Sequence, residues 1–184
     1  MKPHSYTSEG IVLGRINYGE ADRIVSLFSK NHGRVSLIAK GVRRLKSRKR
    51  GHIEIFSKVN FQAISGKGLD IMTEADIIDD YKDVRISLKK VSLAYYLMEV
   101  VGKITHEGEG NLGVYELLVE SLERLKTTKL LKKLRLEYLR DLMVLLGYWP
   151  KDKKMDNPDT ILEEIIERQI YSKRVGKRIL SGVK

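Results

Sequence analysis

Hydrophobic and polar positions alternate in short stretches from the start of the chain to about Asp76. Alternation with a period of two is typical of a strand with one buried face, and turn residues such as Asn31-His32-Gly33 separate the stretches. The pattern predicts five strands, at Tyr6–Ile16, Arg23–Ser29, Arg34–Lys40, Ile53–Ile64 and Leu69–Ala75. Five short strands joined mostly by glycine-containing turns indicate a small closed or nearly closed barrel. An OB-fold is the commonest barrel of this kind, and an SH3-like barrel is the alternative.

From Asp83 onward the hydrophobic period changes to that of helices. We expect a first helix over Ser87–Lys103, a second that is capped by Asn111, and a third from about Thr128 to Gly147. The stripe predicted for the first of these helices is Leu88, Val91, Ala94, Tyr95, Leu97, Met98 and Val101.

Pro158-Asp159 opens a further helix, and a short basic helix is expected over Lys173–Leu180. The sequence therefore predicts an α+β chain in two parts. We expect residues 1–80 to form the N-terminal five-stranded barrel, an OB-fold or an SH3-like barrel, and residues 81–184 to form an all-α helical domain.

Charge is distributed unevenly along the 184 residues, whose net charge is +11. Residues 1–68 contain fourteen Lys or Arg and four Asp or Glu, whereas residues 69–80 contain five acids and no base. Positive charge alone indicates a polyanionic partner, which leaves nucleic acid, an anionic membrane or an acidic protein open. The most apolar stretch, Leu93–Val101, is too short to span a bilayer and contains Glu99, so we expect a cytoplasmic protein without a membrane partner.

The most basic segment is residues 40–51, here called the basic loop, which has seven Lys or Arg and no acid. It falls between two predicted strands. Such a cluster gives salt-sensitive affinity for phosphates, and arginine can also stack on bases. With Tyr18 as the candidate for base stacking, the predicted nucleic-acid-binding residues are Arg15, Tyr18, Arg23, Arg34, Lys40, Arg43, Arg44, Lys46, Arg48, Lys49 and Arg50. Arg23 could instead pair with Glu20 or Asp22. Phe28 and Phe61 are predicted core residues.

No catalytic residue, metal site or cofactor is expected. The chain has no cysteine, and its four histidines have no partner at ligand spacing. Ser65-Gly66-Lys67-Gly68 lacks the upstream glycine and the hydroxyl of a phosphate-binding loop, so it is predicted to be a hairpin turn. The acidic run Glu74–Asp80 is interpreted as a solvated connection or a partner for the basic loop.

The chain resembles the RecO family, the bacterial recombination mediators of the RecF pathway. The resemblance rests on ordered motifs over about seventy residues: Gly10–Leu13, Tyr18–Val25, Leu27–Ser29, Gly33–Val35, Ala39–Arg44, Ser47-Arg48, Gly66–Leu69 and Thr73–Ala75. The helical half matches more loosely, through Leu93–Tyr96 with Glu99 and through Leu145–Pro150.

The resemblance implies an N-terminal OB-fold and a helical C-terminal domain. It also implies binding to single-stranded and double-stranded DNA, annealing of complementary strands, and partnership with RecR. A further implied partner is the C-terminal tail of single-strand-binding protein. The resemblance implies that this protein is displaced from DNA so that RecA can load. Many relatives carry zinc-binding cysteines after the Gly-Tyr-x-Pro segment. This chain has Lys151–Asp156 there, so zinc binding does not carry over.

For the tail of single-strand-binding protein, the expected docking surface is basic and helical, with Lys126, Lys129, Lys132, Lys133 and Arg135; an ordinary solvated helix face is the alternative. Other functions also stay open from the residues alone. These are an OB-fold RNA-binding module acting on tRNA or ribosomes and a scaffold that binds an acidic protein. Attachment to a membrane surface is disfavoured, because the chain lacks an amphipathic helix with bulky aromatic residues beside its basic face.

Overall fold

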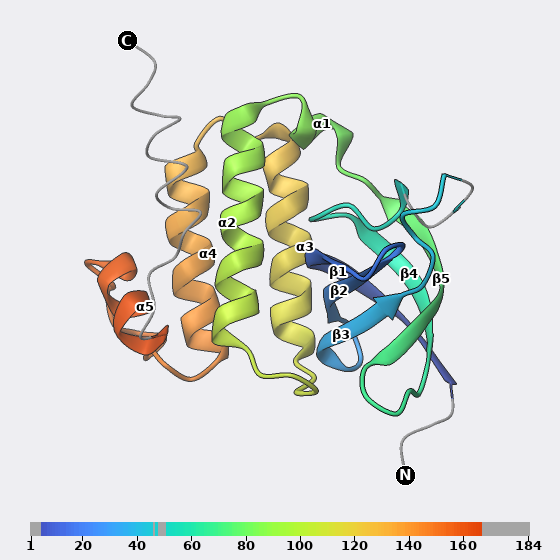
Figure 1. Cartoon of the computed structure of the whole chain (residues 1–184). Helices are drawn as coiled ribbons and strands as arrows, with labels where there is room; N and C mark the ends of the chain where they lie inside the picture. Colours follow the sequence, from blue (N-terminus) through green and yellow to red (C-terminus); the bar gives the residue numbers. More distant parts are fainter. Residues whose placement is uncertain (1–4, 46, 48–50, 167–184) are drawn as a thin grey trace. The chain divides into compact units, whose positions relative to one another are not determined.

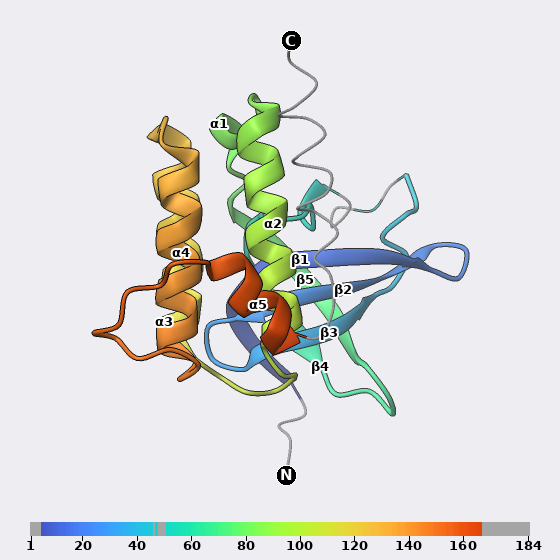
Figure 2. The same cartoon turned by 90° about the vertical axis from the view of Figure 1, so that its left-hand side faces the viewer.

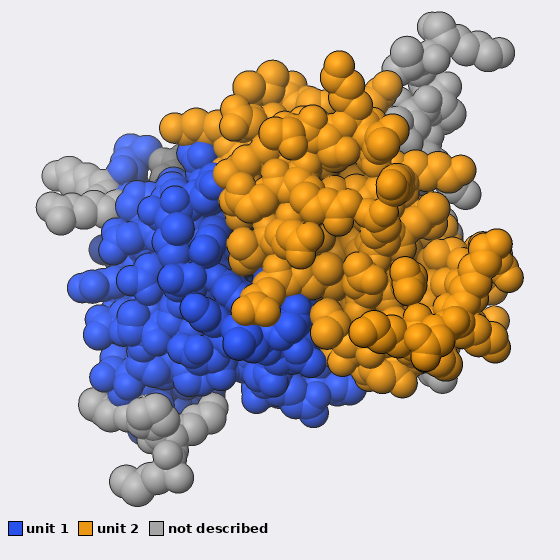
Figure 3. All heavy atoms as spheres, turned by 180° about the vertical axis from the view of Figure 1, so that it is seen from behind, with its two compact units in different colours: residues 1–80, 105–115 blue, residues 81–104, 116–184 orange. Residues whose placement is uncertain are grey.

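The computed structural model describes residues 5–45, 47 and 51–166. It divides into two compact units (Figure 3), which are residues 1–80 with 105–115 and residues 81–104 with 116–184. Residues 105–115 were assigned from the sequence to the helical part, but they group with the barrel. Their contacts explain this, because the amide of Gly108 donates a 2.8 Å hydrogen bond to the carbonyl of Arg34, and Glu107 forms a bridge with the same residue. Because this connection is polar, the sequence shows no hydrophobic periodicity there that would assign it to the barrel.

Five strands form the barrel of the first unit (Figure 1). Their bounds are β1 Ser5–Tyr18, β2 Asp22–Ser29, β3 Gly33–Ala39, β4 Lys58–Ile64 and β5 Asp70–Asp79. The sheet closes in the order β1-β2-β3-β5-β4, with β1 paired to β4. All neighbours are antiparallel except β3 and β5. The predicted OB-fold is confirmed.

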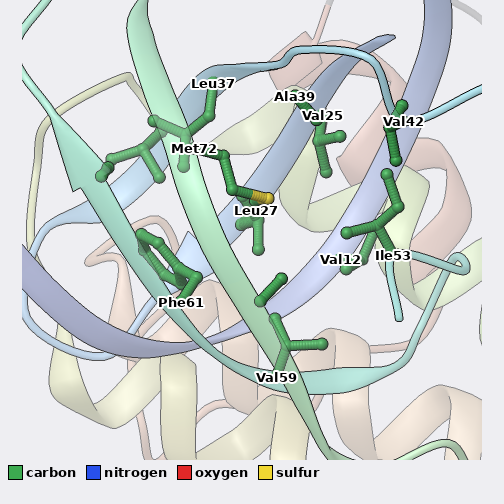
Figure 4. Close-up of a cluster of buried hydrophobic side chains, with 13 residues drawn as sticks. Val12, Val25, Leu27, Leu37, Ala39, Val42, Ile53, Val59, Phe61 and Met72 are labelled. Atoms are coloured by element: carbon green, nitrogen blue, oxygen red, sulfur yellow. The ribbon is translucent and has the colours of Figure 1, made fainter. Parts of the chain in front are cut away.

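The barrel interior is filled by aliphatic residues with one methionine and one phenylalanine (Figure 4). The buried cluster comprises Val12, Val25, Leu27, Val35, Leu37, Ala39, Val42, Ile53, Val59, Phe61, Ala63, Met72 and Ala75. These residues come from every strand and from the segment between β3 and β4. Phe28 and Phe61 are both buried, as predicted.

One strand prediction was wrong at its start. The fourth strand was expected from Ile53, but β4 begins at Lys58. Phe56 has a positive φ of 58°, which an extended strand does not allow. The segment is instead bound to β1, because the amide of Phe56 donates to the carbonyl of Val12 at 2.8 Å. Ile53 and Phe56 are buried without being in a strand.

The helices are α1 Lys82–Arg85, α2 Leu88–Ile104, α3 Leu112–Thr127, α4 Leu131–Leu145 and α5 Pro158–Ile166. In the second unit α2 contacts α1, α4 and α5 (Figure 2). The Asn111 side chain accepts a 3.1 Å hydrogen bond from the amide of Val114, so the predicted cap of α3 is confirmed. The expected helix at Lys173–Leu180 lies outside the described residues.

The buried stripe predicted for α2 was partly wrong. Leu88 and Tyr95 are exposed, whereas Leu93, Tyr96 and Val100 are buried. A helix with neighbours on more than one side buries more than one stripe, so a single helical face does not describe α2.

Candidate nucleic-acid interface

The tip of the β1–β2 hairpin and the beginning of the basic loop are joined by three hydrogen bonds. The carboxylate of Asp22 accepts from the amide of Gly41 at 2.7 Å. The amide of Arg43 donates to the carbonyl of Ala21 at 2.8 Å, and its guanidinium donates to the carbonyl of Gly19 at 3.1 Å. Gly19 and Gly41 both have positive φ, so each turn uses a conformation that glycine adopts without strain.

The basic loop is also anchored by its own residues, through one buried side chain and two backbone hydrogen bonds. Val42 is fully buried in the hydrophobic core of the barrel, so it fixes the start of the loop to the barrel. The amide of Arg44 closes a turn onto the carbonyl of Gly41 at 3.1 Å, and the amide of Ser47 donates to the carbonyl of Arg44 at 3.0 Å. The backbone in the first part of the loop is therefore held in place, and this sets the positions from which the side chains of Arg43 and Arg44 extend.

Five of the predicted residues lie together on this hairpin and loop. Lys40, Arg43 and Arg44 are exposed, and Tyr18 at the end of β1 is 52% exposed. Arg23 pairs across the hairpin with Asn17, and its Nε donates to the Asn17 side-chain oxygen at 3.3 Å. These side chains combine positive charge with one solvent-accessible aromatic ring, which are the two features a single strand requires.

Arg15 is also near this end of the barrel, but its charge is paired. Its guanidinium forms a 2.5 Å ion pair with Glu54, in the segment between β3 and β4. The two side chains are both partly exposed. Because Glu54 offsets the positive charge, Arg15 contributes less to the local field than Lys40, Arg43 or Arg44.

Arg34 lies elsewhere on the barrel. It is at the start of β3, six residues before Lys40, and six residues of strand span about 20 Å. Its contacts with Glu107 and Gly108 connect it to the residues that precede α3. The structure therefore does not bring Arg34 into the cluster on the hairpin and loop. Lys46, Arg48, Lys49 and Arg50 lie outside the described residues.

Other residues of the interface were not predicted. Asp22 and Glu54, which hold the loop and neutralise Arg15, follow no pattern that marks them in the sequence. Ile16 is 64% exposed and Leu45 is 89% exposed, so two large apolar side chains accompany the cations. Ile16 and Tyr18 are two positions apart on one strand, and the period of two places them on the same face.

Within residues 5–45, 47 and 51–166, no group of three or more His, Cys, Asp or Glu could hold a metal ion. In the same part of the chain, no helix has the length and apolar character needed to cross a bilayer.

The barrel defines the class to which the first unit belongs, the OB-folds, which bind oligonucleotides or oligosaccharides. Comparison with known families is more specific. Residues 1–81 match the model of the recombination protein O N-terminal domain, and residues 85–151 match that of its C-terminal domain. The chain belongs to the RecO family.

Individual relatives agree with this assignment. The chain is 30% identical over 156 residues to the DNA repair protein RecO of Dehalococcoides mccartyi, and the match covers 85% of the chain and 62% of the relative. It is 36% identical over 147 residues to the RecO of Rubrobacter xylanophilus, covering 79% and 59%. For Pelotomaculum thermopropionicum the identity is 34% over 145 residues, covering 79% and 56%. The chain thus spans less than two thirds of these relatives' length.

Proposed function

We propose that this chain acts in DNA repair and recombination by binding single-stranded and double-stranded DNA at the basic end of its barrel. In this proposal residues 1–80 are the nucleic-acid-binding domain and residues 81–184 are a helical domain. The protein anneals complementary strands and helps load RecA onto DNA that is coated by single-strand-binding protein. Because chromosomal DNA is the proposed partner, the cytoplasm is the proposed place of action.

One observation carries the proposal. The exposed cations Lys40, Arg43 and Arg44 lie on a loop that is hydrogen-bonded to Asp22 and to the backbone of the β1–β2 hairpin of an OB-fold barrel. Phosphate contacts by such groups release condensed counterions, which gives affinity without sequence preference. The names of the relatives, DNA repair protein RecO, support DNA as the polyanion.

Annealing by this site requires no covalent step, and the proposal assigns none to the chain. Two anionic strands repel each other, and a cationic surface that screens both lowers the free energy of bringing them together. Base pairing then supplies the driving force. The exposed ring of Tyr18 can hold an unpaired base by stacking while the strand is bound.

RecR and the C-terminal tail of single-strand-binding protein are the proposed protein partners. Of the basic residues expected to contact the tail, Arg135 forms an ion pair with Asp159 and Lys126 forms one with Glu123. Lys129, Lys132 and Lys133 are exposed, and Lys133 lies 3.8 Å from the carboxylate of Glu137 in a surface ion pair. We therefore centre the proposed docking surface on these three lysines, and changing all three to Glu should abolish binding of a tail peptide.

An annealing assay tests the proposed function. Purified protein is mixed with two complementary strands, either naked or coated with single-strand-binding protein, and duplex formation is followed by fluorescence. The proposal predicts faster annealing in both conditions. Matched strands of RNA serve as the comparison, because an RNA-binding module would anneal RNA in preference to DNA. Absence of annealing on naked DNA would contradict the proposal.

A further inference from the structure

Two helices of the second unit begin with the same three residues. The helix α2 starts with Leu88-Lys89-Lys90, and α4 starts with Leu131-Lys132-Lys133. Each helix therefore has two lysines in its first turn, and neither has an acid there. The N-terminus of a helix carries a partial positive charge, which favours acids in the first turn and disfavours lysines. Helix stability thus does not explain these two pairs of lysines.

The two pairs lie at the same end of the helical unit. The helices α2 and α4 are in contact, and Figure 1 and Figure 2 both show their beginnings at one end. The Lys90 ammonium donates a 2.5 Å hydrogen bond to the carbonyl of Lys126, in the last turn of α3 and just before α4. Packed helices are about 8–10 Å apart, so the two pairs of lysines are separated by a similar distance.

Part of the positive charge at this end is not neutralised. Lys126 forms a 2.8 Å ion pair with Glu123, and Lys133 lies 3.8 Å from Glu137. Among residues 5–45, 47 and 51–166, three exposed lysines of this end have no acid within ion-pair distance: Lys89, Lys129 and Lys132. We call these three residues the lysine cluster. They come from two helices and the turn before the second, so their charges converge on one surface.

We propose that the lysine cluster is a second DNA-binding surface and that it holds the phosphates of a duplex. A duplex carries one charge per about 1.7 Å of its axis, so about six phosphates fall within a length of about 10 Å. Lysine binds a phosphate as a point charge and needs no fixed orientation to do so. The inference goes beyond the proposed function, which places DNA on the barrel.

The chemistry of the cluster favours a duplex over a single strand. Single strands gain affinity by stacking their bases on aromatic rings. Among the described residues of the second unit, the exposed aromatic side chains are Tyr95 and Tyr148. Tyr95 is about 9 Å along α2 from Lys89, and Tyr148 follows the opposite end of α4. The cluster therefore offers charge without a ring, and the duplex is the ligand with the higher charge density.

Two members of the cluster also belong to the surface proposed for the acidic tail of single-strand-binding protein. Lys129 and Lys132 can neutralise the carboxylates of the tail or the phosphates of a duplex, but not both at once. Binding of a duplex at this end would therefore release the tail. The same surface then serves first in recruitment and later on the product of annealing.

The test compares a blunt duplex with a homopolymeric single strand of the same length, using the full chain. The variant Lys89→Glu/Lys129→Glu/Lys132→Glu removes about three phosphate contacts. It should flatten the salt slope of duplex binding by about 2 to 3 and lower duplex affinity at least about tenfold. The salt slope of single-strand binding should stay the same, because that ligand is held by the barrel.

A control variant separates this effect from a change in net charge. Lys67→Glu/Lys151→Glu/Lys154→Glu makes the same change of charge at lysines that are exposed elsewhere, and it should keep both slopes. Folding is checked by urea denaturation. Acids near the beginnings of α2 and α4 suit the helix dipole, so the cluster variant should be at least as stable as the parent. Weaker duplex binding by a more stable protein cannot come from unfolding.

Three results would overturn the inference. These are an unchanged salt slope for the duplex, an equal change for the single strand, and loss of tail-peptide binding alone. In each case the proposed function stands if Arg43→Glu/Arg44→Glu weakens DNA binding. If neither the lysine variant nor the arginine variant alters DNA binding, the proposed function fails as well.

Discussion

The carboxylate of Asp22 accepts a 2.7 Å hydrogen bond from the backbone amide of Gly41. An acidic residue thus holds the start of the most basic segment of the chain in place. Its charge opposes the local positive field, while its hydrogen bond orients the loop that produces this field. These two effects act on DNA binding with opposite sign, so they can be separated by experiment.

Replacing Asp22 with Ala should weaken DNA binding although it removes a negative charge. Loss of the hydrogen bond leaves the Gly41 amide without this acceptor and loosens the turn, at a cost of about 1–3 kcal/mol to the local structure. We expect a several-fold lower affinity for a short single strand, measured by fluorescence anisotropy. Glu20→Ala removes the same charge from an exposed position on the same hairpin and should raise the affinity slightly. Tighter binding by both variants would show that only charge matters.

Gly33 should not tolerate alanine. Its φ is +63°, and an added Cβ would collide with the backbone carbonyl of Glu109. The strain and the overlap together predict a loss of about 2 kcal/mol or more in the free energy of unfolding. Gly14→Ala is the control, because a Cβ at Gly14 meets open space; it should change stability by less than about 0.5 kcal/mol. Urea denaturation of both variants measures the difference, and equal stabilities would contradict the packing of Glu109 on this turn.

Glu9 should make the protein less stable in acid. Burial alone would raise the pKa of Glu9, but the Tyr115 hydroxyl, which donates at 3.1 Å, and the Lys58 ammonium outweigh it, and the pKa is lowered. A lowered pKa means that the ionised carboxylate contributes stability above its ordinary pKa. This contribution is lost as the pH falls through the folded pKa.

The variant Glu9→Gln should therefore be less stable than the parent at neutral pH, by roughly 1 kcal/mol after allowance for solvent screening. The difference should shrink as the pH falls from about 5 to about 3, because the parent loses its carboxylate there. Denaturant unfolding at several pH values measures it. A difference that does not vary with pH would mean that the Glu9 carboxylate contributes nothing in its charged form.

The link between α4 and α5 should depend on Asp159. Its two carboxylate oxygens accept from Arg135 at 2.6 and 3.0 Å, and the hydroxyl of Tyr96 donates to one of them at 3.2 Å. Asp159→Asn removes the charge that pairs with a partly buried guanidinium, so α5 should open more easily, by about 2 kcal/mol. Hydrogen exchange over Pro158–Ile166 reports this opening. Asp156→Asn, at an exposed ion pair with Lys154, should leave exchange unchanged.

Much of the fold follows from the sequence because its periods are local. The strands and helices were predicted where one face is buried and the other is solvated, as in β3, where Val35, Leu37 and Ala39 alternate with partly exposed residues. The prediction failed where burial comes from long-range contacts. Phe56 is buried, and its amide donates to the carbonyl of Val12 in β1, forty-four residues earlier; no local pattern encodes this contact.

The candidate site was predictable in its charge but not in its geometry. The run of Lys and Arg is visible in the sequence, whereas the pairing of Arg15 with Glu54 and the distance between Arg34 and Lys40 require the fold. The neighbours of a residue across the sheet also require the register between strands. Ile16, Ile24 and Ile38 each fit the pattern of their own strand, and only the pairing of β1, β2 and β3 makes them neighbours.

The salt dependence of single-strand binding reports whether the basic loop contacts the phosphates of DNA. With about four to six phosphates contacted, a plot of log affinity against log salt should have a slope of roughly −3 to −4. Reversing Arg43, Arg44 and Arg48 to Glu should weaken binding to all sequences alike and flatten this slope by about 2. The control reverses Lys67, Lys89 and Lys151, which are exposed elsewhere, and should keep the parental slope. An unchanged slope and affinity in the arginine variant would show that DNA binds at a site outside the basic loop.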